Sequence, residues 1–177
     1  MIIEERVERS QYVKLITWIV SFIILMAGIV FPVLILWVNQ DMMSKVIGAS
    51  VLCLIFFTLI FTVAYQPRKL ILSETHIIME RILGQVYISY SDITDISLYH
   101  RENVAEIRIF GIGGLGGYIG KFYNSKIGFY TAYVGDYSQA FLIKINNREK
   151  YVMSCRHAEK IVEEVCLLYT SPSPRDS

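Results

Sequence analysis

Residues 15–38, LITWIVSFIILMAGIVFPVLILWV, and residues 46–64, VIGASVLCLIFFTLIFTVA, decide the architecture of this 177-residue chain. Neither run contains a charged residue, and only seven residues separate them. As helices they would be about 36 Å and about 28 Å long, and the hydrocarbon core of a bilayer is about 30 Å thick. Because a chain of this size has no core large enough to bury both runs, we predict a transmembrane helical hairpin over residues 15–64.

The residues that flank the two runs predict how the hairpin lies in the membrane. Trp18 and Trp37 are about 28 Å apart along a helix, so we expect one to anchor each membrane interface. The flanking basic residues are Arg6, Arg9 and Lys14 before the first run and Arg68 and Lys69 after the second. By the positive-inside rule, residues 1–14, both termini and the domain after the hairpin are expected in the cytoplasm, with the protein in the bacterial inner membrane.

Residues 66–165 have the pattern of one small β domain closed by a helix. Short β-branched and aromatic runs alternate with turn residues, and Ile107 and Ile109 alternate with charged neighbours, as in a half-buried strand. The expected strands are Lys69–Ser73, His76–Ile82, Gln85–Ser89, Ile93–Tyr99, Val104–Phe110, Ile127–Val134, Gln139–Asn146 and Lys150–Met153. Ser154 is a candidate cap for a final helix with one apolar stripe, formed by Ala158, Ile161, Val162 and Val165. We expect an α+β domain: a roughly seven-stranded antiparallel β barrel or sandwich capped by this helix.

Two short motifs resemble those of the bacterial pleckstrin-homology-like (PH) domains. The pattern L-x-L-(S/T)-x-x-x-I is met by Leu70, Leu72, Ser73 and Ile77, and I-x-Y-x-D-I-x-x-I by Ile88, Tyr90, Asp92, Ile93 and Ile96. The glycine-rich stretch that follows is similar to an insertion in a membrane-associated subgroup. The resemblance covers about residues 67–165 and implies a seven-stranded barrel with a C-terminal helix, without catalytic residues. It also implies roles in protein binding, lipid binding or self-assembly.

A glycine-rich stretch at residues 111–120 is the candidate interaction site. Its residues are Gly111, Gly113, Gly114, Leu115, Gly116, Gly117, Tyr118 and Gly120. The spacing matches the G-x-G-x-x-G of dinucleotide sites, but the next residues have low helix propensity, and no βαβ unit surrounds them. We therefore expect a compact loop or short helix that packs on the domain, on the membrane or on a second copy.

Composition excludes several classes of function. The net charge of +1 lacks the basic excess of nucleic-acid-binding proteins. The three cysteines and three histidines have no metal-ligand spacing, and no nucleophile–base pair is apparent, so we expect no metal, cofactor or catalytic residue. The predicted partners are membrane lipids and a protein, either another chain or a second copy. Membrane-surface sensing through residues 111–120 is the alternative function, and a nucleotide-binding enzyme is a third.

The last residues, 166–177, read CLLYTSPSPRDS and differ abruptly in composition from the helix pattern before them. They look like one reading frame of a sequencing adapter. We expect them to be a non-native tail that takes no part in the function of the protein.

Overall fold

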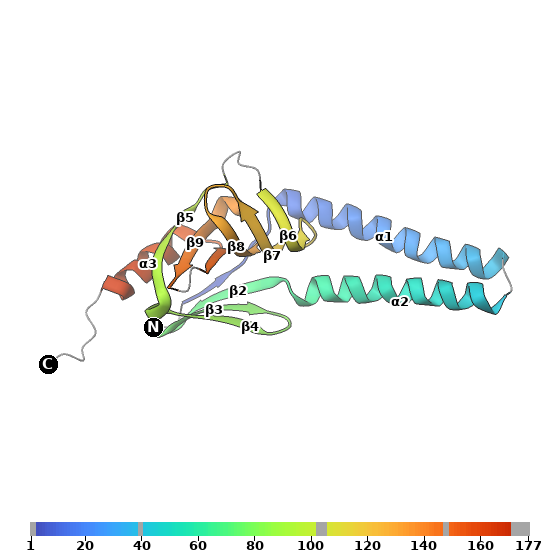
Figure 1. Ribbon diagram of the computed structural model, residues 1–177, viewed down its shortest axis with the longest axis horizontal. Helices are drawn as coiled ribbons and strands as arrows, with labels where there is room; N and C mark the ends of the chain where they lie inside the picture. The colour runs from blue at the N-terminus through green and yellow to red at the C-terminus, as the bar shows by residue number, and fades with distance from the viewer. Residues whose placement is uncertain (1–2, 39–40, 102–105, 147–148, 171–177) are drawn as a thin grey trace.

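The protein is described by a computed structural model that covers residues 3–38, 41–101, 106–146 and 149–170. Two long antiparallel helices, α1 (Gln11–Val38) and α2 (Met42–Ala64), project from one end of a β domain (Figure 1). Both are long and apolar enough to cross a membrane, and in each only 11% of the most apolar stretch is buried. A core helix of a soluble protein would be mostly buried, so this exposure indicates membrane association.

The two helices pack on each other through small residues. Gly28 in α1 is buried, and a Cβ there would lie 3.1 Å from the side chain of Ile55 in α2. Gly48 in α2 is buried close to Pro32 in α1. Small residues allow helix backbones to approach closely where no water drives their association.

In the described residues, ten strands form two sheets. The four-stranded sheet has the order β1-β2-β3-β4, and the six-stranded sheet has the order β5-β9-β10-β8-β7-β6. The strands of the first sheet are β1 (Ile3–Arg6), β2 (Pro67–Leu72), β3 (His76–Arg81) and β4 (Gln85–Ser89). Those of the second are β5 (Ile93–Tyr99), β6 (Glu106–Gly113), β7 (Tyr118–Asn124), β8 (Gly128–Val134), β9 (Ala140–Ile145) and β10 (Lys150–Ser154). Short 3-10 turns precede β5 (Tyr90–Asp92) and β9 (Tyr137–Gln139).

The PH-like motif residues form the centre of the main core. Leu70, Leu72, Ile77, Ile88 and Ile93 are all at most 3% exposed and pack in one cluster with the final helix. That helix is α3 (Ala158–Thr170), whose predicted apolar stripe faces the cluster. The motif thus describes buried packing rather than a ligand site.

The predicted helix pair, the β-rich domain and its C-terminal helix are confirmed, whereas the count of roughly seven strands and the closed antiparallel barrel are wrong. The described strands form two sheets that do not close into a barrel, and β10 runs parallel to β8. Two strands are additions to the prediction, β1 from the N-terminal segment and β7 from the glycine-rich stretch.

Two further predictions, the helix cap at Ser154 and the tail at residues 166–177, also differ from the structure. Ser154 ends β10, and its Oγ accepts a hydrogen bond from the Gly135 N–H at 2.9 Å instead of capping α3. Of the predicted tail, residues 166–170 continue α3, and residues 171–177 lie outside the described part.

Strand β1 ties the start of the chain to the strand that leaves the membrane helices. It pairs with β2 in antiparallel register, from Ile3 opposite Leu72 to Arg6 opposite Lys69. The segments on either side of the helix pair therefore lie in the domain as neighbouring strands, with residues 7–10 connecting β1 to α1.

Candidate functional site

The glycine-rich stretch is a β-hairpin, not a loop or a short helix. Strands β6 and β7 pair along their lengths, with Gly111 directly opposite Gly120, and residues 114–117 form the tip. The Gly114 N–H donates to the Gly117 carbonyl at 2.9 Å and closes that tip. A phosphate-binding G-x-G-x-x-G needs a helix after its last glycine, and here a strand follows, so the hairpin lacks the geometry for a dinucleotide.

The tip of this hairpin packs on the start of α1. The Gly116 N–H donates to Thr17 Oγ1 at 2.8 Å, and Gly114, Gly116 and Gly117 are all buried. A Cβ on Gly116 would come closer than 3.0 Å to the side-chain amide of Gln66, which itself accepts a 2.5 Å hydrogen bond from Arg9. Glycine is therefore required here because the backbone lies directly against the base of the helix pair.

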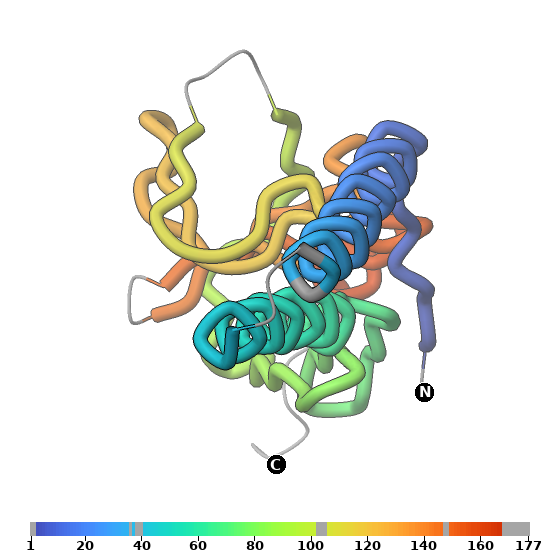
Figure 2. The backbone as a smooth tube through the Cα atoms, turned by 90° about the vertical axis from the view of Figure 1, so that its right-hand side faces the viewer, coloured from blue at the N-terminus to red at the C-terminus, as the bar shows by residue number. Residues whose placement is uncertain are grey.

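The β3–β4 hairpin makes a second connection, on the side of α2. The Leu83 N–H in its turn donates to the carbonyl of Ala64, the last residue of α2, at 2.8 Å. The guanidinium of Arg81 lies 5.4 Å from the ring centroids of both Tyr65 and Tyr133, so it joins the end of α2 to β8. Figure 2 looks along the helices and shows the glycine hairpin, in yellow, beside α1 and the β3–β4 hairpin, in green, beside α2.

The segment between β1 and α1 makes a third connection. The Ser10 N–H donates to the Gly135 carbonyl at 3.2 Å, and the Val7 N–H donates to the Arg68 carbonyl at 3.0 Å. A Cβ on Gly135 would come closer than 3.0 Å to the Glu8 carbonyl oxygen. We call these three sets of contacts the junction, and together they fix the orientation of the β domain relative to the helix pair.

The two tryptophans that are predicted to anchor the membrane interfaces both lie exposed on α1. Trp18 follows Thr17, which holds the glycine tip, and it is 75% exposed. Trp37, near the far end of α1, is 85% exposed. Their role as anchors stays a prediction; Trp18 is next in sequence to Thr17, which belongs to the junction.

The eight predicted loop residues do not form one accessible surface. Leu115 is half-buried in the tip, and Tyr118 turns into a second core cluster. The Tyr118 ring lies 4.8 Å from that of Tyr137, and the Arg101 guanidinium lies 5.1 Å from the Tyr118 ring.

Sequence reasoning missed a buried polar cluster around Glu106. The side chain of this residue is only 4% exposed, and one of its carboxylate oxygens lies 2.7 Å from Arg101 Nε. The other oxygen accepts hydrogen bonds from the hydroxyls of Tyr137, at 2.7 Å, and Tyr130. Burial is the largest cause that raises the pKa of both tyrosines far above 10, so both stay protonated donors to the carboxylate.

The cluster has the features of a stabilising contact between strands rather than of a reactive site. It joins β6 to β8 and to Arg101, which follows β5, and Arg101 also lies 4.6 Å from the Tyr137 ring centroid. In the part of the chain that the structure describes, no group of three His, Cys, Asp or Glu side chains could hold a metal ion. In the sequence, Glu106 alternates with isoleucines in the same way as the charged residues of a half-buried strand. Nothing in this pattern indicates that its side chain is buried.

Comparison with known proteins identifies the family. A model of the family described as bacterial PH domain matches residues 68–166, which is 99 of the 177 residues. No curated protein and no solved structure matches the chain. The matched segment begins at the second residue of β2 and ends within α3, and it contains the buried motif residues of the main core. The chain belongs to the bacterial PH domain family.

Proposed function

We propose that this protein is a non-catalytic module that binds another protein, or a second copy of itself, at the cytoplasmic face of the inner membrane. The bacterial PH domain and the two apolar helices make it a membrane-associated PH-like module. PH-like domains are generally non-catalytic, which supports a binding role over an enzymatic one.

The exposed outer edge of β6 carries the proposal. This strand is last in the order of the six-stranded sheet, and among the described strands it pairs only with β7. Ile107 and Ile109 are 56% and 54% exposed, so the apolar side that a half-buried strand would bury faces outwards. An apolar edge strand with unpaired backbone groups is a template for pairing with another chain.

A groove beside this edge enlarges the apolar surface. It has a volume of about 400 Å³ and includes Ile109 and Phe129, the latter on β8 and 68% exposed. Lys121 and Lys150 lie on its walls with Glu149, so charged groups border the apolar centre. This arrangement is typical of protein interfaces, which have an apolar centre and a polar rim.

Substitution of the β6 edge tests the proposal. We expect the double substitution Ile107→Lys and Ile109→Lys to abolish the proposed complex, as measured by blue-native electrophoresis and by co-purification in mild detergent. Two charges on the pairing edge must lose their hydration in any complex, and natural edge strands use lysine to block such pairing.

The matched control is Leu98→Lys on β5, the opposite edge strand, where the side chain is 38% exposed. This variant should keep the assembly. Two results would contradict the proposal: an assembly that tolerates both β6 lysines, or an unmodified protein that stays monomeric and without a partner at every concentration.

Membrane-surface sensing through the tip of the glycine hairpin has less support. Gly114, Gly116 and Gly117 are buried against α1 and Gln66, which leaves them little surface to offer to lipid. Other residues at the same end of the domain are far more exposed.

A further inference from the structure

The turn of the β3–β4 hairpin carries two adjacent large aliphatic side chains, Ile82 and Leu83. They are 51% and 57% exposed, so neither belongs to the core of the domain. The turn is well ordered by backbone geometry, because the Arg81 N–H donates to the Gly84 carbonyl at 3.2 Å and Gly84 takes a positive φ. Turn tips of hairpins are usually polar, since they project into water, and folding alone gives no reason for isoleucine and leucine here.

The position of this turn explains its composition. Leu83 is hydrogen-bonded through its N–H to Ala64, at the cytoplasmic end of the α2 span. On the other side of the helix pair, Thr17 holds the glycine tip one residue before Trp18. Both hairpin tips point towards the helices in Figure 1, so they lie at the base of the helix pair.

We propose that Ile82 and Leu83 insert into the inner leaflet at its headgroup–acyl boundary and dock the β domain on the membrane that α1 and α2 span. This inference rests on one part of the proposed function, namely that α1 and α2 anchor the protein in a membrane. The turn is held by its Leu83–Ala64 hydrogen bond beside the last turns of α2, which expose the apolar side chains of Phe61 and Val63. Apolar side chains held at this depth are more stable in the interface than in water.

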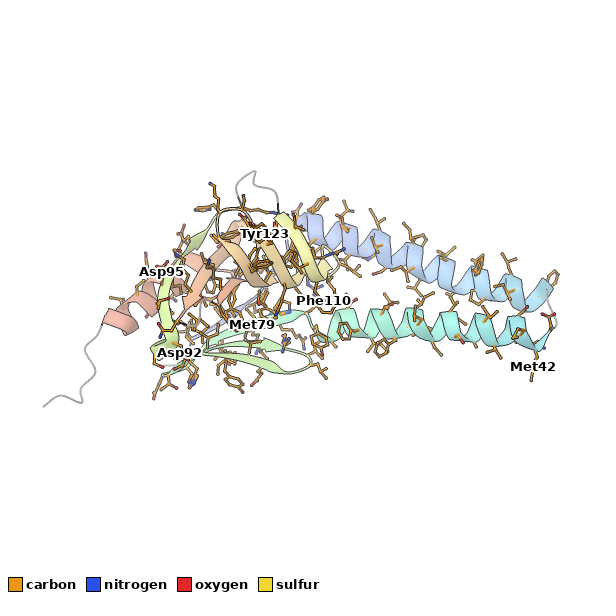
Figure 3. The ribbon with its side chains drawn as sticks, in the orientation of Figure 1. Met42, Met79, Asp92, Asp95, Phe110 and Tyr123 are labelled. Carbon is orange, nitrogen blue, oxygen red and sulfur yellow. The ribbon has the colours of Figure 1, made fainter. Side chains whose placement is uncertain are left out.

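Phe110 supports the same docking face. It is 76% exposed and lies at the end of the domain nearest the helix pair, as Figure 3 shows. In contrast, the labelled Asp92 and Asp95 lie at the opposite end, away from the helices.

The docking is apolar insertion rather than recognition of a charged headgroup. The nearest cation of the turn, Arg81, already lies over the rings of Tyr65 and Tyr133. The insertion should therefore be equal in vesicles of zwitterionic lipid and in vesicles with anionic lipid.

Site-directed spin labelling of the full chain in lipid vesicles tests the insertion. The labelled variants are Leu83→Cys and Ile82→Cys, made with Cys53→Ala and Cys166→Ser. Cys155 remains, because its side chain is buried and burial raises its pKa to about 12, which keeps the thiol unreactive. We expect each turn label to collide readily with oxygen, which concentrates in lipid, and to lose collisions with a water-soluble nickel chelate.

Two matched positions complete the test. Ser91→Cys, exposed in the 3-10 turn that follows β4, should show the opposite preference, for nickel over oxygen. Leu54→Cys, 67% exposed in the middle of α2, should show the strongest preference for oxygen. If Leu54→Cys reports lipid while both turn labels behave as Ser91→Cys does, the docking is refuted and the anchor stands. If Leu54→Cys itself reports water, the membrane anchor of the proposed function fails, and the docking fails with it.

Discussion

Alanine at Gly111 or Gly120 should lower the free energy of unfolding of the β domain by about 3 kcal/mol. The two glycines face each other across the β6–β7 hairpin with φ of +127° and +123°. A Cβ at either position would come closer than 3.0 Å to a backbone carbonyl oxygen of the other strand, that of Ile119 or of Phe110. Both the backbone conformation and the contact therefore oppose a side chain. Chemical denaturation of the full chain in mild detergent, followed by near-ultraviolet circular dichroism of the tyrosines, measures the loss.

Gly113→Ala is the control in the same strand. A Cβ there meets the Arg108 side chain at 3.6 Å, an ordinary contact with a flexible group, so the expected cost is below about 1 kcal/mol. Equal losses at Gly111 and Gly113 would contradict the paired geometry of the hairpin.

Removal of the buried carboxylate by Glu106→Ala should cost about 3–5 kcal/mol, the second large effect. The Arg101 guanidinium would lose its ion pair, and the hydroxyls of Tyr130 and Tyr137 would lose their acceptor in a buried site. The same denaturation experiment measures the change.

The comparison for this variant is an exposed ion pair. Glu4 lies 3.2 Å from Lys69, and the two side chains are 54% and 42% exposed. Because water screens such a pair, Glu4→Ala should cost less than about 1 kcal/mol. If the Glu106→Ala and Glu4→Ala variants had the same free energy of unfolding, the cluster would not stabilise the contact between β6 and β8.

The sequence predicted those parts of the fold in which local pattern and burial agree. The two apolar runs became α1 and α2, and the PH-like motif residues became the main core. The stripe of the final helix also predicted its buried face, since Ala158, Ile161 and Val165 are at most 1% exposed. In each case one periodicity determines both the element and the side that it buries.

The parts that the sequence did not predict depend on contacts between distant segments. Strand β1 forms because β2 offers a partner across the helix pair, some sixty residues away, and four residues carry too little pattern of their own. Strand β7 contains a glycine that local propensity assigns to a loop, whereas pairing of Gly120 with Gly111 makes it a strand.

The β6 strand shows a different limit. Alternation correctly predicted a strand there, but not which side is buried, because the polar partners of Glu106 come from positions 101, 130 and 137. The junction was unpredictable for the same reason. Thr17 and Gly116 are 99 residues apart, and nothing in the sequence around either residue indicates that they form a hydrogen bond.

The central claim is that a membrane-spanning helix pair holds the PH domain on the cytoplasmic side. Impermeant maleimide labelling of bacterial spheroplasts tests it most directly, with Met42→Cys at the first residue of α2 and Ser91→Cys in the domain, both made with Cys53→Ala and Cys166→Ser. The account predicts that Met42→Cys reacts in intact spheroplasts and that Ser91→Cys reacts only after lysis. Reaction of Ser91→Cys from outside, or protection of both thiols until lysis, would contradict it.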